Sequence, residues 1–134
     1  MALNNYFNNF QSGAEQSLIE DLVVESISIY GHTIFYCPRT LINKDDIYGE
    51  DTLSEYNSAF VTEVYVKSYD SYEGDGTFLS KFNLEVRDQI TFTMARRTFG
   101  AEITRMDGTI IRPREGDLIY SEMMRRLFII KYVN

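Results

Sequence analysis

The sequence has few of the residues from which small proteins build covalent or metal sites. It contains one cysteine, one histidine, two prolines and no tryptophan among 134 residues. A single thiol excludes an intrachain disulfide and gives no sign of an oxidising compartment, so we expect synthesis in the cytosol. One cysteine and one histidine are too few for a zinc site. His32 and Cys37 lie five positions apart, so a strand would place them on opposite faces, out of reach for a thiol–imidazole nucleophile.

Long apolar runs and phosphate-binding motifs are also missing. No run approaches the roughly 18 apolar residues needed to cross a bilayer, and residues 1–11 lack the basic end and apolar centre of a signal peptide. Gly74-Asp75-Gly76 is too short to cradle a phosphate. The segment Asp70 to Asp75 resembles a calcium loop, but Tyr72 replaces the third ligand and Lys81 the twelfth. We therefore expect no membrane contact, no metal and no cofactor.

Positive charge is scarce overall, and it is unevenly placed. The net charge is 13 − 20 = −7, which repels nucleic acid and anionic membranes. Residues 1–95 carry five basic and fifteen acidic side chains, whereas residues 96–134 carry eight and five. This split suits a subunit whose acidic face meets a neighbour's basic face, or one whose basic end lies near phosphate; an ordinary solvated surface fits equally well. The basic half contains Arg96, Arg97, Arg105, Arg112, Arg114, Arg125 and Arg126. We favour pairing of these arginines with acidic neighbours over the alternative, a lining for moving DNA.

The first predicted element is a helix over residues 12–30. Ser12 and Glu15 have the spacing of a capping box, and Gly31 is placed to end the helix. Apolar residues recur at steps of three and four, as in an amphipathic helix. They are Leu18, Ile19, Leu22, Val23 and Ile27.

The rest of the chain indicates strands and loops. Residues 33–36 form a short strand that stops near Pro38. Residues 60–67 alternate as a strand, with Phe60, Thr62, Val64 and Val66 on one side and Val61, Glu63, Tyr65 and Lys67 on the other. Alternation over residues 82–94 predicts a long strand after a glycine-rich break, and residues 43–57 are a polar loop or arm. Residues 95–107 are ambiguous. Residues 112–120 predict an entry turn and, with residues 127–133, a β-hairpin.

These elements predict a mainly β (α+β) fold, with the N-terminal amphipathic helix packed on a small antiparallel β-barrel or sandwich. We expect one domain over residues 1–134, divided into an N-terminal arm (1–11), the helix (12–30) and a β core with loops (33–134). The aromatic content of 14% supports the β assignment.

No catalytic arrangement is visible in the sequence. Glu115 and Asp117 are two residues apart in an apparent turn, so we expect solvated carboxylates without acid–base chemistry. An enzyme would need carboxylates gathered by the fold, with Asp45, Asp46 and Glu50 as candidates. We expect no enzymatic activity.

Several short segments, in colinear order, resemble one protein family. They are residues 17–27 (SLIEDLVVESI), 36–39 (YCPR), 46–51 (DIYGED), 71–74 (SYEG), 78–82 (FLSKF), 86–91 (VRDQIT) and 114–120 (REGDLIY). Together they resemble the neck proteins of T-even-type contractile-tailed bacteriophages over about residues 17–133. Colinear matches are far more specific than any one of them.

The resemblance implies a non-enzymatic virion protein of the phage neck. Such a protein forms a ring, expected to hold six copies, between the portal-side head-completion protein and the tail-terminator protein. The ring completes the filled head, gates the channel for double-stranded DNA without sequence specificity, and provides the docking platform for the tail. Residues 43–57 and 69–77 are the expected ring or lumen contacts, and residues 112–120 the docking edge. The predicted interface residues are Asp45, Asp46, Tyr48, Glu50, Asp51, Tyr72, Glu73, Arg112, Arg114, Glu115, Asp117, Tyr120, Arg125 and Arg126.

Two points stay open in the sequence. Family members continue beyond the equivalent of Val133, so we expect this chain to be a compact variant or to lack a C-terminal part. The alternative function is a stand-alone small β-barrel that binds a peptide or a nucleic acid as a monomer.

Overall fold

The computed structural model describes residues 12–51, 53–70 and 89–134. Its helices are α1 (Gly13–Tyr30), α3 (Arg96–Phe99) and the π-helical turn η1 (Gly100–Thr104). Its strands are β1 (His32–Cys37), β2 (Thr40–Leu41), β3 (Ser54–Glu55), β4 (Phe60–Asp70), β5 (Gln89–Thr93), β6 (Leu118–Ser121) and β7 (Arg126–Ile129).

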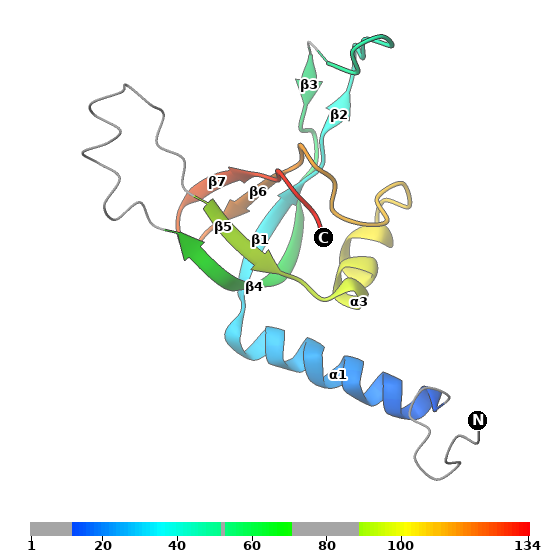
Figure 1. Cartoon of the computed structure of the whole chain (residues 1–134), viewed down its shortest axis with the longest axis vertical. Coiled ribbons are helices and arrows are strands. Elements are labelled where there is room, and N and C mark those ends of the chain that lie inside the picture. Colours follow the sequence, from blue (N-terminus) through cyan, green and yellow to red (C-terminus); the bar gives the residue numbers. More distant parts are fainter. Residues whose placement is uncertain (1–11, 52, 71–88) are drawn as a thin grey trace, which may run out of the picture.

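Within the described residues, five strands form one curled antiparallel sheet. The strand order is β5-β4-β1-β6-β7, and the sheet curls so far that its two edges approach each other (Figure 1). The rings of Phe92 on β5 and Phe128 on β7 meet edge to face, with their centroids 5.8 Å apart. The sheet is therefore a half-barrel, and the predicted mainly β fold is confirmed.

The core lies on the concave side of this sheet. Ile34 and Tyr36 of β1, Val64 of β4 and Ile119 of β6 point inward and are buried, as the two-residue period of a strand requires. The short helix α3–η1 covers this side, because its Phe99 packs edge to face on Tyr36 with ring centroids 5.4 Å apart. Residues 95–107, for which the sequence gave no clear prediction, thus contain the helix that covers the core.

Helix α1 precedes the half-barrel and runs along its lower end (Figure 1). The Ser12 side chain accepts a hydrogen bond from the backbone N–H of Glu15 at 3.4 Å, so the predicted helix start is confirmed. Gly31 ends the helix with a backbone φ of −83°, so it is not needed there for a left-handed conformation. A Cβ at Gly31 would instead lie 2.6 Å from the backbone oxygen of Val64. Gly31 therefore allows the chain to cross β4 in close contact.

Strands β2 and β3 form a separate two-stranded hairpin that projects from the opposite end of the molecule (Figure 1). The predicted arm over residues 43–57 corresponds to this projection, with a strand at each side of its base. We call residues 40–57 the arm.

The other strands can be compared with the ranges predicted from the sequence. β1, β4 and the β6–β7 hairpin lie where the sequence predicted them, and Thr62 and Val64 face inward. The long strand predicted over residues 82–94 corresponds to β5 from Gln89 onward. Residues 82–88 and most of the glycine-rich break lie outside the described residues.

Candidate functional site

The base of the arm is fixed to the half-barrel by a buried carboxylate. Asp117 stands at the start of β6 and is 1% exposed. Its carboxylate accepts hydrogen bonds from the Tyr36 hydroxyl, from the backbone N–H of Arg39 at 2.8 Å, and from Nε of Arg114 at 3.3 Å. The prediction of a solvated turn carboxylate is therefore wrong for Asp117, because Tyr36 and Arg39, which are distant in sequence, enclose it. Glu115 is exposed as predicted.

Arg39 extends this network into the arm. Its Nε donates to Oγ of Ser54 on β3 at 2.7 Å, and its backbone oxygen accepts from Arg114 at 3.3 Å. Tyr56 adds a second tie, since its hydroxyl donates to the backbone oxygen of Gly116 at 3.0 Å. Burial, together with the bond to Asp117, raises the pKa of the Tyr36 phenol far above its usual value. A buried phenol that stays protonated suits positioning of the arm rather than proton transfer.

Asp51 organises the outer part of the arm. Its carboxylate accepts from the backbone N–H groups of Asn43 at 2.9 Å, Ile42 at 3.1 Å and Leu53 at 3.2 Å. Burial acts to raise the pKa of Asp51, but these backbone hydrogen bonds outweigh it and lower the pKa. A backbone bonded in this way presents its tip in a defined conformation.

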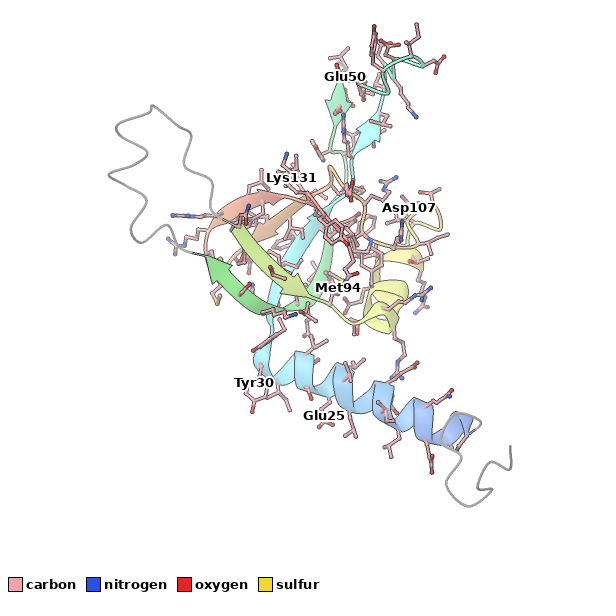
Figure 2. The ribbon with its side chains drawn as sticks, in the orientation of Figure 1. Glu25, Tyr30, Glu50, Met94, Asp107 and Lys131 are labelled. Carbon is pink, nitrogen blue, oxygen red and sulfur yellow. The ribbon has the colours of Figure 1, made fainter. Side chains whose placement is uncertain are left out.

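The tip of the arm combines exposed apolar and acidic side chains. Ile47 and Tyr48 are 84% and 80% exposed, and Asp45, Asp46 and Glu50 beside them are exposed as well. Glu50 lies at the far end of the projecting arm in Figure 2. The tip is closed by a hydrogen bond from the Gly49 N–H to the Asp45 carbonyl at 2.8 Å. A bare apolar tip on a braced arm is typical of a contact with another molecule.

The structure brings most of the predicted interface residues into two groups. The arm carries Asp45, Asp46, Tyr48, Glu50 and Asp51, whereas Arg114, Glu115 and Asp117 lie at its base, just after Arg112. Tyr120 lies on β6, Arg125 lies in the β6–β7 turn, and Arg126 is the first residue of β7. Tyr72 and Glu73 lie outside the described residues. The role of these residues as contacts stays a prediction.

Arg97 and Arg114 have acidic partners in their own chain. Arg97 of α3 forms an ion pair with Asp21 of α1 and approaches Glu20 of the same helix at 3.9 Å. Arg114 pairs with Asp117 at 3.3 Å. For these two side chains, pairing is intramolecular rather than between subunits.

Most of the apolar side of α1 is not covered by the half-barrel. Within α1, all of which the structure describes, Ile27 is the buried residue and Val24 is half-buried. Glu25 points away from the sheet in Figure 2, and the apolar side chains near it on the helix surface are exposed. Val23 and Tyr30, also exposed, border an open hollow between α1 and the sheet. We call this exposed set the helix band; it consists of Leu18, Ile19, Leu22, Val23, Ile29 and Tyr30. The sequence revealed the apolar side of the helix but not the direction in which it faces.

A second apolar surface crosses the convex side of the sheet. The register pairs Phe35 with Val61 on one side and with Tyr120 on the other, and pairs Tyr120 with Leu127. Val61 and Leu127 are 53% and 59% exposed. We call these four residues the outer stripe. An antiparallel sheet with a solvated face normally shows polar residues there, so this stripe is a candidate contact surface that sequence alternation alone did not reveal.

Two further features concern the part of the chain that the structure describes: the grouping of its metal-ligating side chains and the apolarity of its helices. This part contains no group of three or more histidine, cysteine, aspartate or glutamate residues that could hold a metal ion. No described helix is both long enough and apolar enough to pass through a bilayer.

Comparison with known proteins gives one family. The model of the T4 neck-protein family, described as a virus neck protein, matches residues 1–134, the whole chain. No solved structure matches the chain.

Proposed function

The chain belongs to the T4-type virus neck protein family, and from that membership we propose that it forms a ring in the neck of the particle. Membership makes it a structural protein of a bacteriophage virion. The finer proposal is a ring of six copies between the portal-side head-completion protein and the tail-terminator protein. In this position it completes the DNA-filled head and gives the tail its docking platform.

The observation that carries the proposal is the braced arm. An arm held at its base by the Asp117 network and along its length by Asp51 loses little conformational entropy on binding. Its tip offers Ile47 and Tyr48 as apolar anchors inside an acidic surround. A projecting, preorganised element of this kind fits a protein that works by joining others.

The charge distribution supports a ring. A ring needs heterologous contacts, in which one surface of each copy meets a different surface of the next. Helix α1 has four acidic and no basic side chains, whereas residues 96–134 have eight basic and five acidic ones. Contacts between an acidic surface and a basic one favour the head-to-tail arrangement over like-with-like pairing.

The same charges support the proposed channel for DNA. A net charge of −7 disfavours tight binding of the phosphate backbone. An acidic lining would let DNA slide through the ring without being held.

Sedimentation of the full chain tests this function. We expect rings, either with the pure protein or after addition of the head-completion and tail-terminator proteins. A protein that stays monomeric in every mixture, and that binds DNA saturably at low salt, would favour the alternative of a stand-alone binding module.

A head–tail joining assay tests the tip of the arm. The combined change Asp45→Asn, Asp46→Asn and Glu50→Gln should reduce joining if the tip is a contact. Unchanged joining would remove the tip from the proposal.

A further inference from the structure

We propose that the helix band of one copy docks on the outer stripe of a second copy, and that this contact builds the ring. The inference rests on the proposed function, because it names the interface of that assembly. It starts from two apolar surfaces that the described residues leave uncovered, one on α1 and one on the convex side of the sheet. Exposed patches of this kind mark binding surfaces in soluble proteins.

The helix band cannot turn to cover the outer stripe of its own chain. Three contacts hold the opposite side of α1 against the half-barrel. The Ser28 hydroxyl donates to Glu63 of β4 at 2.6 Å, Arg97 pairs with the acidic side of the helix, and Gly31 packs directly on β4. Because the inward side of α1 is fixed, the helix band does not pack on the described part of its own sheet and is open to a second copy.

Charge disfavours pairing of two α1 helices. Glu15 and Glu25 lie on or beside the helix band, and α1 has no basic residue to neutralise the same carboxylates of a partner helix. The outer stripe ends instead near a basic segment. Residues 122–131 contain Arg125, Arg126 and Lys131 against one acid, Glu122. The acidic helix is therefore complementary to the end of the sheet at β7.

The two surfaces also match in length. From Leu18 to Ile29 the helix band extends over eleven steps, or about 16 Å at the rise of an α-helix. The outer stripe spans four neighbouring strands, from Val61 to Leu127, or about 14 Å at the usual strand spacing. Beside the helix band, between α1 and the sheet, lies an open hollow of about 360 Å³ lined by Val23 and Tyr65, among others. A second copy could fill this hollow with a side chain.

Disulfide cross-linking of the full chain tests the contact. In a Cys37→Ser background, the double variant Leu22→Cys/Leu127→Cys should form a ladder of covalent oligomers when oxidised, because each link joins the helix of one copy to the sheet of the next. Neither single variant can form a ladder. The control pair Ser17→Cys/Leu127→Cys moves the helix thiol to the polar side of α1 and should give no ladder.

The outcomes separate this interface from the ring itself. Rings in sedimentation without a Leu22–Leu127 ladder would overturn the interface and leave the ring standing. Oxidised monomers linked within one chain, or links from position 22 only to another neck protein, would also overturn it. A chain that never assembles would refute both proposals. Leu22→Ala and Leu127→Ala should each weaken self-association by on the order of tenfold, with Ser17→Ala unchanged.

Discussion

Removing the Tyr36 hydroxyl should destabilise the protein more than removing any exposed one. In Tyr36→Phe the ring still fills its place beside Phe99, so the change creates no cavity and deletes one hydrogen bond to the buried Asp117 carboxylate. A hydrogen bond to a charged group contributes about 1.5 to 3 kcal/mol. For a chain of this length that corresponds to a melting temperature lower by roughly 5 to 10 °C.

The matched control is Tyr56→Phe. The Tyr56 hydroxyl also donates to the base of the arm, at 3.0 Å from the Gly116 oxygen, but it is exposed, and water can replace it. We expect a loss of at most about 0.5 to 1 kcal/mol there. Urea unfolding followed by circular dichroism measures both variants. Equal stabilities of Tyr36→Phe and wild type would refute the assignment of Asp117 as the buried centre of the arm's base.

The same network predicts a pH dependence. Burial and the bond to Asp117 raise the pKa of Tyr36 above its usual value of 10.0. Because the pKa of Tyr36 is raised in the folded state, the stabilisation by its hydrogen bond is fully present below a pH of about 10. It is lost as the pH rises through the pKa of Tyr36 in the folded protein. The difference in unfolding free energy between wild type and Tyr36→Phe should therefore be constant from neutral pH to about pH 10 and shrink at higher pH. A difference that disappeared below pH 9 would contradict this reasoning.

Three further changes have defined outcomes. Gly31→Ala should cost at least about 2 kcal/mol, because its Cβ would lie 2.6 Å from the Val64 oxygen, whereas Gly13→Ala, with open space around it, should be neutral or stabilising in the same unfolding assay. Hydrogen bonds lower the pKa of Asp51, so NMR signals of the arm should keep their dispersion above pH 3.8 and lose it as the pH falls through the lowered value; Asp51→Asn should abolish this transition. Arg97→Ala should cost less than about 1 kcal/mol, because both partners of its ion pairs are more than half exposed, and a larger loss in a melting experiment would show that α1 depends on that pair.

Local sequence patterns were sufficient to predict most of the helices and strands of this fold. The Ser12 cap and the three- and four-residue apolar steps predicted α1, and the alternation over residues 60–67 predicted β4 and the division of its side chains between two faces. These signals are local because the period of a helix or strand is a property of consecutive residues. Residues 95–107 carried no clear period, and the short α3–η1 helix is defined by its packing on Tyr36 rather than by propensity.

The sites depended on contacts that a sequence does not display. Asp117 lies in an Arg-Glu-Gly-Asp turn, a sequence that predicts a carboxylate exposed to solvent. In the structure, Tyr36 and Arg39, which are 81 and 78 residues away in the chain, bury it. The direction of the helix band was equally hidden, because periodicity identifies an apolar side but not the neighbour that it faces. The outer stripe arises from the register of four strands, and each strand contributes one residue that looks ordinary alone.

Electron cryo-microscopy of mature particles tests the central claim most directly. If the chain is a structural ring subunit, the map should contain a closed ring of its copies between portal and tail, with arms projecting from each half-barrel toward a neighbouring protein. Particles that carry a complete neck without this chain, or that hold it as separate copies touching no second one, would contradict the claim.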